Sequence, residues 1–213
     1  MTAEVFARLG EVAEDWWGMF TSSQAAEIGV SPHQLSRLVR SGALERPVQG
    51  VYRMAGAPPT EGDLLRAYWL ALGGYKKTSA GVADVVAAGT TAAGLHGVGD
   101  FYTDKYDFVV PRRRGTRLQN VRLRTRELSR KDVSRIDGLP VMRVERMIAD
   151  LVEGNQDLSL VGDVVGDAHR SGLISSEAKL AHYLDPLARR NQQASGADMR
   201  EYLYDIAGVS IGR

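Results

Sequence analysis

Apolar residues near the N-terminus recur at the spacing of an amphipathic helix. The pattern covers residues 3–17 and stops at Gly18. Because residues three and four apart share one face of a helix, this spacing predicts a first helix with one buried stripe. Trp17 adjoins the stripe and is expected, with Trp16, to anchor the core. The residues of the stripe are Val5, Leu9, Val12 and Trp16.

Two capping signals mark the starts of the next two helices. Thr21 is followed by Gln24, and Ser31 is followed by Gln34. A hydroxyl at the N-cap and a Gln three residues later can satisfy the unpaired backbone amides of a helix start. Pro32 strengthens the second signal, because the first helical position does not need a backbone N–H. Two short helices joined by a tight turn are typical of a helix-turn-helix unit.

The second of these helices has two different faces. Leu35, Leu38 and Val39 fall at helical spacing and are expected to pack against the preceding helix. The opposite face carries side chains that can donate to base edges or phosphates, and a recognition helix reads DNA with its N-terminal residues. The arginines on it can read guanine or hold phosphates, and an ordinary solvated face is the alternative. The candidate DNA-binding residues of this helix and its cap are Ser31, His33, Gln34, Ser36, Arg37 and Arg40.

A short antiparallel hairpin is predicted directly after this helix. Apolar positions alternate over residues 44–54, with a Pro and a Gly between the two runs. Such a two-stranded wing can reach a phosphate or the neighbouring minor groove. Arg46, Gln49 and Arg53 are the candidate contacts on it. Residues 1–56 are therefore predicted to form a winged helix-turn-helix DNA-binding domain.

A second domain of α+β type is expected over residues 57–213. It is predicted to be β-rich to about residue 145 and helical from there to the end. One of its strands alternates apolar residues with arginine, a period of two that places Arg122, Arg124 and Arg126 on one exposed face. The fold class is thus α+β, a winged helix-turn-helix followed by a mixed α/β domain with a helical tail. The strands expected in the second domain are 85–87, 106–110, 121–126 and 139–142.

The charge of the chain is segregated although its sum is small. The formal net charge is only +1, which gives no overall electrostatic case for nucleic acid. Residues 112–135 hold ten basic side chains and two acidic ones. The basic run is a candidate for an additional nucleic-acid or partner surface, and a solvated loop is the alternative. Its candidate residues are Arg112, Arg113, Arg114, Arg117, Arg122, Arg124 and Arg126.

The residue types that carry catalysis or bind metals do not form a known pattern. The sequence contains no cysteine, which excludes disulfides and thiolate metal sites. A carboxylate-x-Lys pattern at Glu177 and Lys179, with Asp163 or Asp167 upstream, matches part of a nuclease motif. Glu177 also fits a helix start, where acidic residues favour the helix dipole. We therefore expect no metal, no cofactor and no enzymatic activity. An apolar run of roughly 20 residues, as a membrane helix needs, does not occur, and the acidic N-terminus does not suit a signal peptide, so a cytoplasmic protein is expected.

The segment from Met19 to Met54 resembles the N-terminal winged helix of AbiEi-type antitoxins of bacterial type IV toxin–antitoxin systems. Two later stretches, TTAAGLHGVGDF at 90–101 and DGLPVMRVERMIADLV at 137–152, are similar to further signatures of that family. The segment from Tyr75 to Asp84 departs from the family pattern. The resemblance implies a repressor that binds inverted-repeat operator DNA in front of its own operon. It also implies that the protein counteracts a nucleotidyltransferase-like toxin encoded beside it.

Two matters stay open at this point. A type IV antitoxin opposes the effect of its toxin and need not form a stable complex with it, and the sequence leaves the oligomeric state undetermined. The alternative function is a stand-alone winged-helix transcriptional regulator whose second domain senses a ligand or dimerises.

Overall fold

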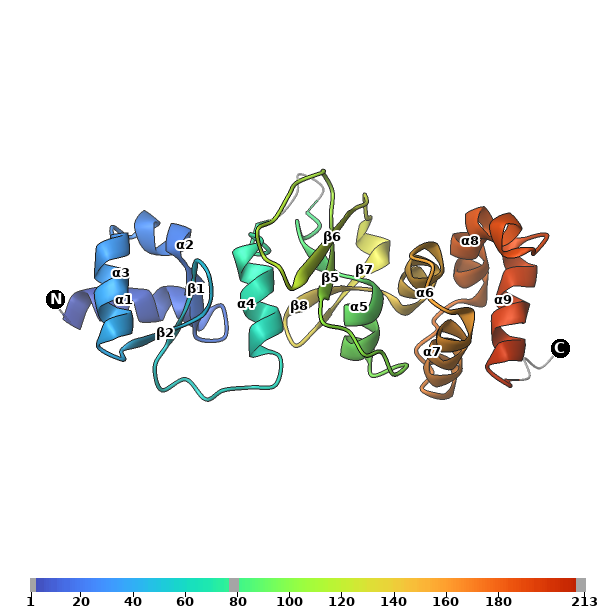
Figure 1. Ribbon diagram of the computed structural model, residues 1–213, viewed down its shortest axis with the longest axis horizontal. Helices are drawn as coiled ribbons and strands as arrows, with labels where there is room; N and C mark the ends of the chain where they lie inside the picture. The colour runs from blue at the N-terminus through green and yellow to red at the C-terminus, as the bar shows by residue number, and fades with distance from the viewer. Residues whose placement is uncertain (1–2, 77–80, 210–213) are drawn as a thin grey trace. The chain divides into compact units, whose positions relative to one another are not determined.

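The computed structural model describes residues 3–76 and 81–209. The chain divides into two compact units, Met1–Lys76 and Lys77–Arg213. Each unit is described by itself below, with the element labels of Figure 1. The class is α+β, as the sequence predicts. None of the helices in the described residues is long and apolar enough to cross a membrane.

The first unit is a winged helix-turn-helix. Its three-stranded antiparallel sheet has the order β1-β3-β2. The sequence predicts only the β2–β3 hairpin, and β1 was missed because its three residues are too few to show a period. The elements are α1 (Ala3–Glu14), β1 (Met19–Thr21), α2 (Ser22–Glu27), α3 (Pro32–Arg40), β2 (Leu44–Val48), β3 (Val51–Met54) and α4 (Asp63–Ala71).

The core of this unit joins the helices to the sheet. Phe20 of β1 stacks on Tyr52 of β3 with ring centroids 5.7 Å apart, and both residues are buried. Leu35 and Leu38 of α3 belong to the same cluster, as their helical spacing predicts. Both predicted capping boxes are present, at Thr21 for α2 and at Ser31 for α3.

Helix α4 belongs to the first unit. Its Trp69 is buried, and its ring lies 5.7 Å from that of Trp16 and 5.9 Å from that of Trp17. The sequence places the boundary between domains near residue 56 and assigns this helix to the second domain. The compact unit instead extends to Lys76, because Trp69 packs on the two tryptophans that follow α1.

The second unit contains a five-stranded mixed sheet of order β6-β5-β4-β8-β7. The strand pairs β4–β8 and β5–β6 are parallel, and β4–β5 and β7–β8 are antiparallel. Strand β7 was not predicted from the sequence, whereas β5 and β8 have the predicted bounds. The elements up to the last strand are β4 (Val86–Ala87), α5 (Gly89–His96), β5 (Tyr106–Val110), β6 (Val121–Thr125), η1 (Arg130–Asp132), β7 (Val133–Ile136) and β8 (Leu139–Met142).

The rest of the second unit is helical, as the sequence predicts. In Figure 1 these helices gather in one group beside the sheet. A Cβ atom on Gly196 would lie 2.0 Å from the backbone oxygen of Ala181, so only glycine lets α9 start so close to α8. The elements are α6 (Val144–Glu153), α7 (Leu158–Arg170), α8 (Glu177–Ala188), η2 (Arg189–Asn191) and α9 (Gly196–Ile206).

Candidate nucleic-acid interface

The start of α3 is fixed by reciprocal hydrogen bonds. The Gln34 amide donates to Ser31 Oγ at 3.3 Å, and the Ser31 amide donates to Gln34 Oε1 at 2.8 Å. Pro32 occupies the first turn. Leu35 and Leu38 are nearly inaccessible to solvent, and they fix which face of the helix points outward. Ser31 and Gln34 are thus engaged in the cap, and the Gln34 side chain keeps only its NH2 group for another partner.

The outward face of α3 carries the other candidate contacts. His33, Ser36, Arg37 and Arg40 are all exposed. Arg40 Nε donates to the backbone oxygen of Ser36 at 3.4 Å. Neither Arg37 nor Arg40 forms an ion pair with a carboxylate within the described part of the chain. Their guanidinium groups are therefore free to bind a phosphate or a base edge.

The wing presents two of its three candidate contacts to solvent. Arg46 is exposed, and its Cζ lies 5.9 Å from the centroid of the Tyr52 ring, within reach of a cation–π interaction. Gln49 is exposed in the turn of the hairpin, where the following Gly50 has a φ of +82°. Arg46 and Gln49 are therefore open to a nucleic acid.

The third wing residue, Arg53, faces the protein. Only 14% of its side chain is exposed, and it forms ion pairs with Glu45 and with Asp63, the latter at 2.8 Å between Nη1 and Oδ2. The hydrogen bond to Glu45 raises the pKa of the Arg53 guanidinium, and Asp63 adds to this effect. Arg53 therefore lies outside the surface that α3, Arg46 and Gln49 offer.

The basic run of the second unit falls into two structurally different groups. The first group lies on the loop between β5 and β6, where Arg112, Arg113 and Arg117 are exposed. Arg114 on the same loop is 3.7 Å from Asp84, measured from Nη1 to Oδ2. This loop is thus a basic surface, in the position that the sequence predicts.

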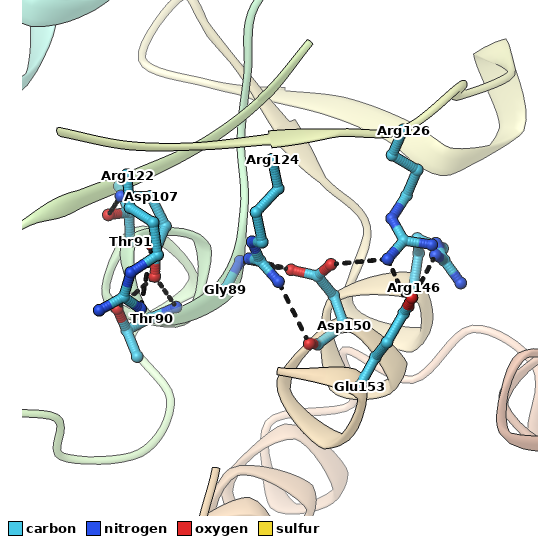
Figure 2. Close-up of polar contacts among 10 residues, drawn as sticks. All are labelled: Gly89, Thr90, Thr91, Asp107, Arg122, Arg124, Arg126, Arg146, Asp150 and Glu153. Atoms are coloured by element: carbon cyan, nitrogen blue, oxygen red, sulfur yellow. Dashed lines mark hydrogen bonds and ion pairs between the residues drawn. The ribbon is translucent and has the colours of Figure 1, made fainter. Parts of the chain in front are cut away.

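The second group comprises Arg122 and Arg124 of β6 and Arg126, which directly follows that strand. They share one face of the strand, as predicted, but Figure 2 shows that this face turns toward carboxylates. Arg122 Nη1 lies 3.3 Å from Asp107 Oδ1, and Arg124 Nη2 lies 2.5 Å from Asp150 Oδ2. Arg124 and Arg126 are partly buried, and Arg122 is about half exposed. The prediction of a common exposed face is therefore wrong for Arg124 and Arg126.

The carboxylates that hold these arginines were not predicted from the sequence. Asp150 of α6 is completely buried and also accepts a hydrogen bond from the Gly89 amide at 3.0 Å. Burial raises the pKa of Asp150 although Arg124 and Arg126 oppose the shift. The sequence contains one signal for this ion pair, since Asp150 lies among the apolar residues of a helix. A charge buried there needs a partner of opposite sign.

A polar cavity of about 300 Å³ lies beside this cluster. Asp107 on its wall accepts hydrogen bonds from the Thr90 amide at 3.3 Å and from Thr90 Oγ1 at 2.9 Å. The cavity is therefore lined by ion pairs that already stabilise the unit. Its lining side chains include Asp107, Arg122, Arg124, Asp150 and Gln156.

The nuclease-like pattern has a structural role in the second unit. Glu177 begins α8, and its Oε1 accepts a hydrogen bond from the Tyr204 hydroxyl at 2.7 Å. Asp167 accepts one from the Gly99 amide at 2.8 Å. Among residues 3–76 and 81–209, no three His, Asp or Glu side chains converge in a way that could hold a metal ion.

Comparison with known proteins identifies the class of the first unit. Residues 8–55 match the family model described as "Transcriptional regulator, AbiEi antitoxin". The winged helix-turn-helix thus matches a domain of transcriptional regulators. More particularly, it is similar to the AbiEi antitoxin domain, and the predicted resemblance is confirmed for these residues.

Solved structures share the fold beyond the matched residues. The crystal structure of the RV2827C protein from Mycobacterium tuberculosis is similar with a TM-score of 0.56 and 17% identity, over 98% of this chain and 79% of that chain. At this identity the similarity concerns the fold alone. No curated protein matches the chain.

Proposed function

We propose that this protein is a cytoplasmic antitoxin of a bacterial type IV toxin–antitoxin system. It binds inverted-repeat operator DNA, represses its own operon and counteracts a nucleotidyltransferase-like toxin encoded beside it. The observation that carries the proposal is the outward face of α3, where Arg37 and Arg40 are exposed and have no carboxylate partner within the described residues. That face belongs to a domain that matches the AbiEi antitoxin regulators.

In this mechanism α3 enters the major groove with its N-terminal half leading. His33, Ser36 and Arg37 then meet base edges, and Arg40 lies closer to the backbone. Arg46 and Gln49 on the wing reach a phosphate or the adjacent minor groove. Because the net charge is only +1, affinity depends on the placement of these few arginines.

The loop between β5 and β6 is proposed to contact either the phosphate backbone of the DNA or a protein partner. Arg112, Arg113 and Arg117 are exposed on it. Arg124 and Arg126 are left out of this surface, since both pair with Asp150.

Fluorescence anisotropy on the protein's own upstream DNA and on a scrambled duplex tests the DNA-binding half. The double variant Arg37→Ala/Arg40→Ala should lose sequence-selective binding across a salt series. A matched control is Arg143→Ala/Arg189→Ala, which removes two exposed charges of the second unit. Binding that is absent or equal on both duplexes would refute operator recognition.

A toxicity-rescue assay with the adjacent gene tests the antitoxin half. Co-expression of the full chain should restore growth in cells that express the neighbouring toxin. The Arg37→Ala/Arg40→Ala variant, expressed from an unrelated promoter, should still rescue if neutralisation and repression are separate activities. Failure of the wild-type chain to rescue would remove the antitoxin half and leave a DNA-binding regulator.

The second candidate function is a transcriptional regulator whose second unit senses a ligand or dimerises. The polar cavity beside Asp107 and Asp150 is the observation that favours it. In that case the toxin assay shows no rescue, and operator affinity changes when a small polar metabolite is added.

A further inference from the structure

Arg53 joins the two strands of the wing. It lies directly opposite Glu45 in the β2–β3 ladder, and its Nε donates to Glu45 Oε2 at 3.0 Å. The register of the ladder shifts between Glu45 and Val48, so Arg46 sits at a bulge that begins next to this pair. A bulge re-aims the side chain that it contains. The Glu45–Arg53 pair therefore fixes the point from which Arg46 is presented.

The same guanidinium ties the wing to α4. Arg53 Nη1 donates to Asp63 Oδ2 at 2.8 Å, and Asp63 is the first residue of α4. Asp63 is itself held by Thr60, whose amide donates to Oδ2 at 2.9 Å and whose hydroxyl donates to Oδ1 at 2.5 Å. Its position is thus fixed independently of Arg53.

A further arginine extends this connection to the aromatic cluster. Arg66 Nη1 donates to Thr60 Oγ1 at 2.7 Å, and its Cζ lies 5.0 Å from the centroid of the Trp17 ring. Trp17 in turn packs on the buried Trp69 of α4. The wing is therefore linked by hydrogen bonds and ring contacts to the buried Trp69.

Arg53 is poorly suited to bind a phosphate directly. To do so it would have to break two ion pairs, which would leave Glu45 without its arginine beside the DNA and Asp63 with only Arg66, 3.6 Å away. Arg46 and Arg40 have no carboxylate partner in the described part of the chain and pay no such cost.

We propose that Arg53 is a positioning residue for operator recognition. Together with Glu45 and Asp63 it holds the wing on α4, so that Arg46 and Gln49 meet the DNA at the same time as α3. This inference rests on the proposed DNA-binding function. It predicts that loss of the Asp63 carboxylate weakens DNA binding. Removal of a negative charge by itself would strengthen that binding.

The test compares three single variants of the full chain, Arg53→Gln, Asp63→Asn and Arg46→Gln, over a salt series on operator DNA. Arg46→Gln, as the contact control, should reduce the log–log salt slope by about 0.9 for each phosphate lost. Arg53→Gln and Asp63→Asn should weaken binding roughly three- to tenfold, because ion pairs of this kind contribute modest energies. The salt slope should stay unchanged, because Arg46 still reaches its phosphate in the complex and only the ordering of the wing before binding is lost.

Amide hydrogen exchange of the free protein gives a second readout. Protection of β2 and β3 should fall in Arg53→Gln and Asp63→Asn but not in Arg46→Gln. Protection of α2 and α3 should stay at the wild-type level in all three, which shows that the variants remain folded.

Two results would overturn the inference. One is a slope for Arg53→Gln that falls as it does for Arg46→Gln while exchange is unchanged, which marks a direct phosphate contact. The other is tighter binding by Asp63→Asn.

If the wild-type protein does not select its operator, the proposed function fails. The exchange data then decide alone: unchanged wing protection overturns the link between the wing and α4, and reduced protection supports it.

Discussion

Arg124 donates a 2.5 Å hydrogen bond to Asp150, a carboxylate with no exposed surface. The pair joins β6 to α6, two elements that are far apart in the sequence. The Gly89 amide and Arg126 approach the same carboxylate. The arginines of this strand look free in the sequence. In the structure, Arg124 and Arg126 instead pair with Asp150 inside the second unit.

Asp150→Ala should destabilise the second unit by about 3–5 kcal/mol, because it leaves two partly buried arginines without their buried partner. Chemical denaturation followed by circular dichroism measures the change. Glu153→Gln is the control, since Glu153 is 39% exposed and its loss should cost about 1 kcal/mol or less. Equal stability of Asp150→Ala and the wild type would show that the ion pairs contribute nothing.

Arg37→Ala should weaken binding to the operator by roughly 1–3 kcal/mol, as expected for an arginine that reads a base. Binding to a random duplex should change much less. Anisotropy titrations of both duplexes at one salt concentration measure the difference. Equal losses on the two would assign Arg37 to the phosphate backbone.

The triple variant Arg112→Gln/Arg113→Gln/Arg117→Gln should lower the salt slope of DNA binding by about 0.9 for each phosphate that the loop contacts. The loop side chains are exposed, so folding should be unaffected, as a melting curve would verify. An unchanged slope would assign this loop to a protein partner or to solvent.

Trp69→Ala should destabilise the first unit by about 3–5 kcal/mol, because it removes a large buried side chain. Hydrogen exchange of α1 and β1 should rise with it. Leu64→Ala in the same helix is the control, since Leu64 is 43% exposed and its truncation should have little effect. Wild-type protection of α1 in Trp69→Ala would contradict the assignment of α4 to this unit.

The stability of the second unit should fall on acidification through Glu145. Burial would raise the pKa of this carboxyl, but hydrogen bonds from the Ser175 hydroxyl at 2.6 Å and from the Ser175 and Ser176 amides hold it below its usual range. A lowered pKa in the folded state contributes stability that is present above the unfolded-state pKa of about 4.3 and is lost as the pH falls through the lower folded value.

Denaturation midpoints measured between pH 7 and pH 3 should therefore decline less steeply in Glu145→Gln, which starts from a lower stability at pH 7. Ser175→Ala retains the carboxylate and loses one donor, so its profile should lie between the other two. Parallel profiles of all three proteins would show that Glu145 does not cause the loss of stability at low pH.

The local signals of the first unit were sufficient to predict most of it. Ser31-Pro32 and Gln34 specify a helix start through bonds that span three residues, and the structure contains those bonds. The outward face of α3 followed from the same helical period. The actual roles of Arg53 and Arg124 could not be predicted, because their partners, Asp63 and Asp150, meet them only through tertiary folding.

The packing of Trp69 on Trp16 and Trp17 also determines where the first unit can be separated from the rest of the chain. A chimera that replaces the first unit of this chain with another domain should be joined after Lys76. A cut directly after the wing would remove Trp69 from the transferred domain. The indole rings of Trp16 and Trp17 would then be exposed to water. The part of this chain that can be exchanged as a unit thus extends beyond the wing to Lys76.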